Sequence, residues 1–248
     1  MKIFRKIRFD LLKNNNSSGK YLKYAIGEIV LVVIGILIAL QINLWNEDRK
    51  NTDILTANLE GVLKELKIDA NKVNDLIINY KENNKNRKNF INVPNYEKLS
   101  LGVLEGSLEN FTKDLDLQYS YFKKIQNSGI TQFGDYEKIM EGLIEYYDNT
   151  LPYLNKLTAI YDDQVTKEDE FWRYEQNSYE FNFLDGLKSY QTDQEAKRKL
   201  IELLKTPTAR NILKIDMRRN IFIISRLSKL KPKLKNMILS LEEILSKN

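Results

Sequence analysis

Acidic side chains at two places in the sequence could do chemistry. Glu28 lies one turn inside an apolar run, YAIGEIVLVVIGILIALQINLW, that extends from Tyr24 to Trp45. A carboxylate in such a run either lies at a membrane interface, where it costs little, or binds an ion or a proton inside a helix bundle. A second acidic group lies among aromatic residues, where paired carboxylates would do general acid–base work or hold a cation. Its members are Asp162, Asp163, Glu168, Asp169, Glu170, Glu175 and Glu180.

Two absent residue types restrict this chemistry. The chain has no histidine, which excludes a Ser-His-Asp triad, a histidine phosphorelay and zinc sites with histidine ligands. It has no cysteine, which excludes disulfides and thiol nucleophiles. No calcium-loop spacing, glycine-rich phosphate loop or nucleophile elbow is present. We therefore predict a non-catalytic protein without a cofactor or metal, and we interpret the second acidic group as a solvated helix face.

The apolar run predicts a transmembrane helix. The twenty residues from Ala25 to Leu44 would span roughly 30 Å, the thickness of the hydrocarbon layer. Tyr24 and Trp45 are amphipathic aromatic residues suited to the two membrane interfaces. No small residues with the spacing of a cleavage site follow the run, so we expect a retained anchor rather than a signal peptide. A buried core helix is the alternative, and the basic flank disfavours it.

The positive charge of the chain is confined to its beginning. Residues 1–23 contain seven cations and one anion, whereas the rest of the chain contains 32 cations and 33 anions. Because basic flanks stay in the cytoplasm, we predict a basic cytoplasmic tail at 1–23, a transmembrane helix at 24–45 and an extracytoplasmic helical domain at 46–248. We therefore expect a single-pass protein of the inner (cytoplasmic) membrane, with the lipid bilayer as a partner. The near-neutral outer domain predicts no nucleic-acid partner.

One face of the predicted membrane helix has a four-residue repeat. Small residues let two helix backbones approach closely in lipid, and Gly35 and Ala39 form a small-xxx-small pair within this repeat. Two intramembrane polar residues, Glu28 and Gln41, flank the face. We therefore predict a homo-oligomer, or a membrane-protein partner, that packs against this face. Its residues are Gly27, Leu31, Gly35, Ala39 and Asn43.

Two stretches carry a resemblance to a known family. The segment KYLKYAIGEIVLVVIGILIALQINLWNEDRK, after the basic start MKIFRKIR, resembles the opening of a bacterial family of uncharacterised single-pass membrane proteins, a domain of unknown function. The stretch from Tyr119 to Asn149 is similar to a second part of that family, in which a Ser-Gly turn separates two helices and a Tyr-Tyr pair ends the second. The resemblance implies a membrane anchor and a helical extracytoplasmic part, and it supplies no activity and no catalytic residues.

The outer domain is predicted to be all-α. Gly and Pro, which turns require, are few, and no stretch alternates with a two-residue period. Apolar residues from Leu55 to Tyr80 follow 3-4 spacing, which predicts one face of a helical bundle rather than an isolated coiled coil. This helix is predicted to fade in the polar run 81–89 and to stop by Pro94, and Pro232 bends or breaks the last helix. Further helices are predicted at 96–109, 111–126, 135–147 (capped by Asp135), 151–175, 192–205 (opened by a capping box of Thr192 and Glu195), 208–227 and 233–245.

Three functions are compatible with these patterns. The first, which we favour, is a membrane-anchored, non-catalytic helical module for protein interaction, assembly or sensing. The second is an accessory subunit of an ion-driven membrane complex that uses Glu28. The third is a carboxylate-dependent enzyme, for which a domain without histidine offers little support.

Overall fold

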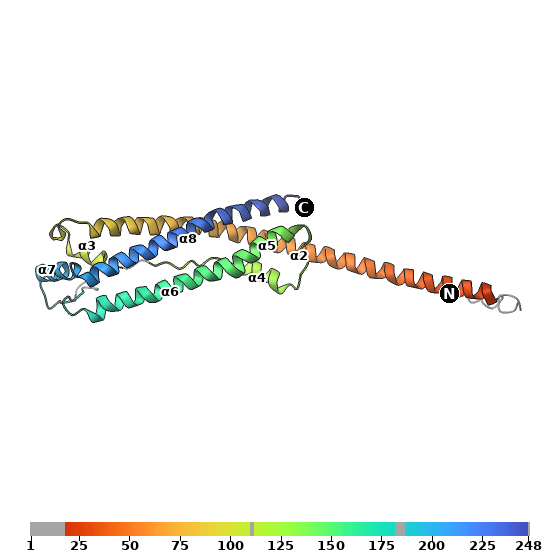
Figure 1. Ribbon diagram of the computed structural model, residues 1–248, viewed down its shortest axis with the longest axis horizontal. Helices are drawn as coiled ribbons and strands as arrows, with labels where there is room; N and C mark the ends of the chain where they lie inside the picture. Colours follow the sequence, from red (N-terminus) through yellow and green to blue (C-terminus); the bar gives the residue numbers. More distant parts are fainter. Residues whose placement is uncertain (1–17, 110–111, 182–186, 248) are drawn as a thin grey trace. The chain divides into compact units, whose positions relative to one another are not determined.

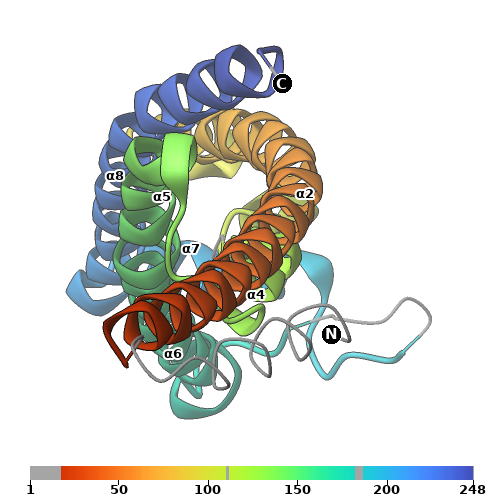
Figure 2. The same cartoon turned by 90° about the vertical axis from the view of Figure 1, so that its right-hand side faces the viewer.

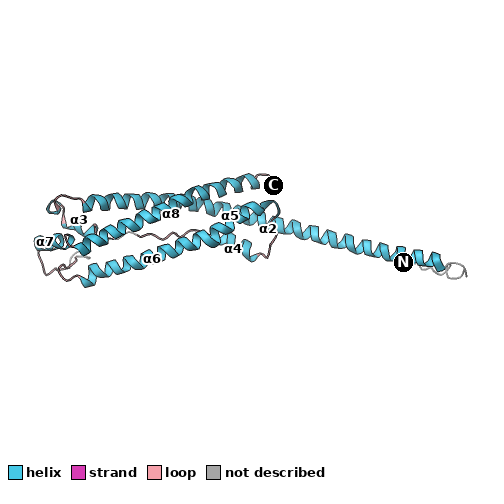
Figure 3. Cartoon of the chain, viewed as in Figure 1, coloured by secondary structure: helices cyan, strands magenta, loops and turns pink. Residues whose placement is uncertain are grey.

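Every regular element in the described part of the chain is helical, as predicted (Figures 1 and 3). The computed structural model describes residues 18–109, 112–181 and 187–247, so most of the predicted tail lies outside it. In chain order the elements are α2 (Ser18–Ile91), η1 (Tyr96–Lys98), α3 (Leu101–Gly106), α4 (Ser120–Asn127), η2 (Gly134–Tyr136), α5 (Glu137–Ile144), η3 (Glu145–Thr150), α6 (Leu151–Glu170), η4 (Phe171–Glu175), α7 (Asp193–Leu204) and α8 (Pro207–Leu245). The chain divides into two compact units, Met1–Leu55 and Thr56–Asn248.

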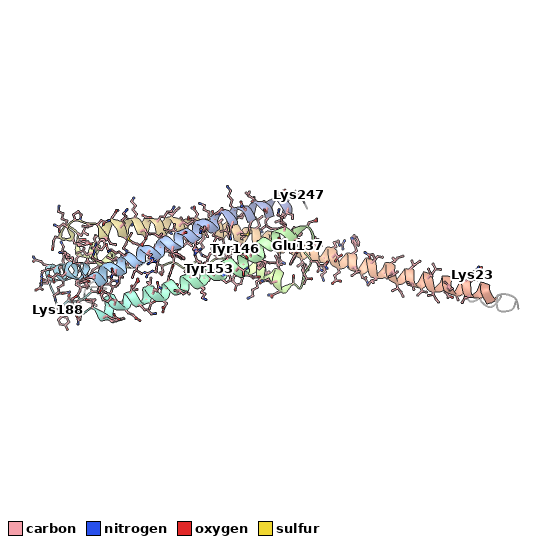
Figure 4. The ribbon with its side chains drawn as sticks, in the orientation of Figure 1. Lys23, Glu137, Tyr146, Tyr153, Lys188 and Lys247 are labelled. Carbon is pink, nitrogen blue, oxygen red and sulfur yellow. The ribbon has the colours of Figure 1, made fainter. Side chains whose placement is uncertain are left out.

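The described part of the first unit is the beginning of α2. From Leu22 to Lys50 every side chain is exposed except that of Ala25, which is half-buried. Side chains project from this stretch all along its length (Figure 4). Among the described residues, α2 is the one helix long and apolar enough to cross a membrane. An apolar stretch with no protein surface over it requires lipid or another protein in its place.

The second unit is built on three long helical stretches that lie side by side (Figures 1 and 2). They are the 56–91 part of α2, the unbroken succession of α5, η3, α6 and η4, and α8. Lys67 pairs with Glu242, and Lys231 donates to Asn74 Oδ1, so α8 runs antiparallel to α2. Tyr146 and Tyr153, both labelled in Figure 4, lie along the stretch from α5 to η4.

The apolar face predicted from 3-4 spacing is the core-facing side of α2. All of its members are buried, which confirms that this face packs within the chain. They are Leu55, Leu59, Val62, Leu66, Val73, Leu76, Ile77 and Tyr80. A second cluster of buried residues joins η1, α3, η4 and the α7–α8 corner, and it contains Phe90, Tyr96, Leu104, Leu108, Trp172, Tyr179, Leu200 and Leu204.

The helix predicted over 111–126 is wrong for most of its length. Residues 112–119 form no regular structure, and helix α4 begins only at Ser120. Leu115 and Leu117 are both buried, which is the alternation of an extended segment rather than the spacing of a helix. Asp116 between them has a φ of 41°, a conformation that aspartate tolerates better than most residues.

Two expected interruptions are absent, although α2 ends where the sequence predicts. Helix α2 extends through the polar run 81–89 and ends at Ile91, before Pro94. No break occurs at Thr150 or Pro152, because the wider turn of η3 leads directly into α6. Helix α8 also passes through Pro232. That proline is exposed, so water can satisfy the carbonyl that loses its hydrogen bond.

Two helix starts were predicted from capping residues, with opposite outcomes. The capping box of Thr192 and Glu195 is present, and α7 begins directly after it, which confirms the predicted start. Asp135 does not cap the α5 stretch. It lies inside the short helix η2, and Tyr136 precedes α5 without a side-chain cap.

Candidate functional site

The face predicted to pack in the membrane is uncovered in this structure. Gly27, Leu31, Gly35, Ala39 and Asn43 are all exposed. A methyl group built on Gly27 or Gly35 meets no atom within 4 Å. Glu28 and Gln41, the two polar residues of the stretch, are exposed as well. The structure therefore leaves room for a second helix against this face, and association itself stays a prediction.

The acidic group on α6 and η4 is mostly solvated, in agreement with the interpretation from the sequence. Asp163 pairs with Lys167, and Asp169 with Arg173, each one helical turn apart on the surface. Glu168 differs, because its side chain is only 13% exposed and it binds an arginine of α8. Among the described residues, no three acidic side chains are arranged to hold a metal ion.

Glu168 belongs to an ion network in the interior of the bundle. Arg219 donates to both carboxylate oxygens of Glu168 at 2.5 Å and to Asp216 Oδ1 at 3.3 Å. Asp216 Oδ2 accepts from Arg87 Nε at 3.2 Å and from Nη2 at 3.0 Å. The side chains of Arg87 and Asp216 are 4% and 0% exposed. Two cations and two anions balance here, which is the condition for keeping buried charges ionised.

An amide layer next to the network extends it between α2 and α8. Asn220 Nδ2 donates to Asn83 at 2.9 Å and to Asn84 at 3.1 Å, and Asn84 Nδ2 donates to the Met217 carbonyl at 3.2 Å. These asparagine side chains can pair in only one register of α2 against α8. A shift of one residue would leave their amide groups without partners. The polar run 81–89 is therefore the part of α2 that fixes its alignment with α8.

The extended segment after α3 is held by side chains of α2. Its backbone has no neighbouring strand, so other groups must take its hydrogen bonds. Five α2 side chains do so along the helix: Arg87 to the Ser107 and Glu109 carbonyls, Tyr80 to Lys113, Lys72 to Asp116, Asp69 to Gln118, and Glu65 to Ser120 and Tyr121.

Two buried carboxylates secure the end of this segment. Glu65 accepts the Ser120 and Tyr121 N–H groups at the start of α4, where a negative charge stabilises a helix. Asp69 accepts the Gln118 N–H at 3.0 Å and the Tyr146 hydroxyl at 3.3 Å. Burial raises the pKa of Asp69 to about 6, although both hydrogen bonds oppose this rise. Asp69, which lies within the stretch of α2 that carries the buried apolar face, therefore makes structural contacts.

These buried groups hold the bundle together, and each has a protein partner. The cavity beside Arg219 and Asn220 measures about 10 Å³, room for one water molecule. Glu28 and the stripe from Gly27 to Asn43 belong to the other compact unit. Sequence patterns missed the ion network, since its partners lie far apart in the chain. Comparison with family models, curated proteins and solved structures finds no match for this chain.

Proposed function

We propose that this protein is a membrane-anchored, non-catalytic helical module that associates through its membrane helix and holds a helical bundle outside the membrane. The observation that supports this most is the exposure of an apolar stretch, residues 22–45 with only Ala25 half-buried, in a chain whose other long apolar face is buried. The basic tail supports a cytoplasmic N-terminus, and so an extracytoplasmic bundle. The resemblance to a family of single-pass membrane proteins agrees with this arrangement.

The proposed contact is the small-residue face. Gly35 and Ala39 lie one turn apart and present little side chain, so a neighbouring helix can approach the backbone there. Asn43 lies one turn further along and supplies an amide that can hydrogen-bond across two helices in lipid. A second copy of the chain offers the same face, which suits a symmetric pair.

The test is the size of the complex in mild detergent, measured by light scattering. The double variant Gly35→Leu, Ala39→Leu places bulky side chains on the face, and we expect it to reduce the complex to a smaller species. The matched control is Val30→Leu, Val33→Leu on the opposite side of the helix, which should keep the original size. An unchanged size for both variants would show that the face is not the contact.

The position of Glu28 favours one alternative function, that of an accessory subunit in an ion-driven complex. Glu28 lies seven residues, or two helical turns, before Gly35, so a partner against the small-residue face would meet its carboxylate. An accessory subunit of an ion-driven complex would need that carboxylate. Glu28→Gln removes the charge and keeps the shape. The alternative predicts a co-purifying multi-span protein whose ion-dependent activity is lost in this variant, whereas the module we propose keeps its complex.

A further inference from the structure

Helices α6 and α8 lie side by side and share an outer face (Figure 1). The guanidinium carbon of Arg226 on α8 lies 5.6 Å from the ring centroid of Tyr153 on α6 and 4.7 Å from that of Phe222. Arg219, earlier on α8, pairs with Glu168, later on α6. These two contacts show that the helices run antiparallel, and they mark the two ends of the shared face.

Exposed apolar side chains form the centre of this face. Ile160 lies seven residues after Tyr153, which is two turns along the same side of α6. Ile160 and Phe222 both lie between the two contacts just described, so they occupy the same interval of the helix pair. Tyr153, Ile160 and Phe222 are 48%, 46% and 40% exposed. Single exposed apolar residues are normal on a protein surface, whereas a group of neighbours marks a site of interaction.

Two arginines beside this apolar centre have no acidic partner. Within the described residues, neither Arg218 nor Arg226 forms an ion pair, and Arg226 stacks on aromatic rings instead. Burial raises the pKa of the Tyr161 hydroxyl on α6, and the nearby cations of Arg219, Arg226 and Arg218 act in the opposite direction. All three arginines therefore lie around this tyrosine, and only Arg219 belongs to the buried ion network.

The carboxylates near this face are engaged or lie elsewhere. Over residues 207–241, α8 has nine cations and a single acid, Asp216, whose side chain is buried in the ion network. On α6, Asp163 pairs with Lys167 on the surface, and Asp162 lines the small cavity beside that network. The exposed charge around the apolar centre is therefore positive.

We propose that this face, defined by Tyr153, Ile160, Phe222, Arg218 and Arg226, binds an acidic amphipathic helix of a partner protein. A helix that lies along two antiparallel helices inserts apolar side chains at every third or fourth position, which the apolar centre would receive. The two arginines donate charge-assisted hydrogen bonds to carboxylates beside those apolar side chains. Phenylalanine, tyrosine and arginine are also the residues that protein interfaces favour.

The same charges disfavour a second copy of this chain as the occupant. A symmetric pair through this face would bring the arginines of both copies together, and like charges across an interface weaken it. A polyanion without apolar side chains would leave Ile160 and the rings exposed to water. All residues of the face belong to the bundle, so this proposal goes beyond association through the membrane helix, and either proposal can fail without the other.

The first measurement is the fluorescence anisotropy of a labelled peptide, titrated with the full-length protein in phosphatidylcholine nanodiscs. The peptide forms a helix of about five turns, with leucines at 3-4 spacing and glutamates beside them. We expect saturable binding that empty nanodiscs do not give. A scrambled peptide of the same composition controls for attraction to the basic tail, and it should bind at least about tenfold more weakly because its leucines share no face. Equal binding of the two peptides, or no saturation, would overturn the proposal.

Variants then locate the bound peptide. Arg226→Glu should weaken its binding at least about tenfold, the scale of a close charge pair at an interface. Lys235→Glu is the matched control, because this exposed lysine lies nine residues later, on the opposite side of α8, and its replacement changes the charge equally. Phe222→Ser should weaken binding as well. Its control is Ile221→Ser, an exposed neighbour about 100° around the helix, which should leave binding unchanged.

A charge-reversed peptide completes the test. A peptide with lysines in place of the glutamates should bind the double variant Arg218→Glu, Arg226→Glu more tightly than it binds the wild type. Equal losses in Arg226→Glu and Lys235→Glu would mean that overall charge, rather than this face, attracts the acidic peptide. That result, or a lysine peptide that does not prefer the double variant, would contradict the proposal.

Discussion

Helix α2 contains two stretches whose apolar side chains have opposite surroundings. Between residues 22 and 45 the helix is apolar on all sides and no protein covers it. Between residues 56 and 91 apolar residues occupy one face, and that face is buried. The two stretches have the same helix geometry but different surroundings. The distribution of apolar residues around the helix, on all sides or on one face, distinguishes the exposed stretch from the buried face.

The comparison also explains where polar residues are tolerated. In the bundle stretch, the buried side chains of Glu65, Asp69 and Arg87 each have hydrogen-bond partners from another segment of the chain. In the apolar stretch, Glu28, Gln41 and Asn43 face outward. Substitutions in the bundle stretch of α2 should therefore lower the stability of the bundle more than substitutions in the apolar stretch.

The largest difference should come from the ion network. Arg87→Met removes two hydrogen bonds to Asp216 and two to carbonyls of the extended segment. We expect the free energy of unfolding of the bundle to fall by about 3–5 kcal/mol, because buried acceptors lose their cation. Urea denaturation followed by circular dichroism measures this loss.

The matched control for that change is Lys81→Met, at an exposed position of the same helix, which should change stability by less than about 0.5 kcal/mol. Arg87→Met combined with Asp216→Leu should regain part of the loss, because no unpaired carboxylate remains. A similar small effect of both single variants would mean that the network contributes little to stability.

The second-largest expected effect is the dependence of the stability of the bundle on pH. Asp69 has a raised pKa, about 6 against 3.8, so the folded bundle holds a proton that the unfolded chain releases. The contribution of this group to the free energy of unfolding is therefore fully present below pH 3.8 and is lost as pH rises to about 6. The whole change is about 3 kcal/mol.

Asp69→Asn tests this assignment, because the amide keeps an acceptor for the Gln118 N–H and a polar contact to Tyr146 but does not titrate. Urea denaturation at pH 4 and pH 7 should show that the variant loses less stability than the wild type between the two values. At pH 7 it should be at least as stable. Equal losses would assign the pH dependence to another group.

Much of the fold could be predicted from local patterns. The 3-4 spacing from Leu55 to Tyr80 and the capping box at Thr192 each concern residues within a few turns of one another, and both are observed. The extended segment could not be predicted in this way. Leu115 and Leu117 also fit a helical pattern, and what holds them extended is a set of α2 side chains more than thirty residues earlier.

The same limit applies to the sites. The small-residue face is a four-residue repeat and is visible in the sequence. The ion network joins Arg87 to Asp216 across 129 residues, and no local spacing reveals that pair.

The smallest expected effect is the difference between substituting a glycine of the bundle stretch and substituting one of the apolar stretch. A methyl group on Gly61 would lie 2.1 Å from Cδ1 of Tyr121, whereas one on Gly35 meets nothing within 4 Å. Gly61→Ala gains about 1 kcal/mol of helix propensity, yet displacing the Tyr121 ring costs about 1–3 kcal/mol, so the net change should be destabilising. Gly35→Ala should leave bundle unfolding unchanged. Tyr121→Ala removes the clash, so Gly61→Ala should stabilise that variant. Stabilisation of the wild-type bundle by Gly61→Ala would instead show that the ring moves aside freely, and that this close approach does not constrain α2.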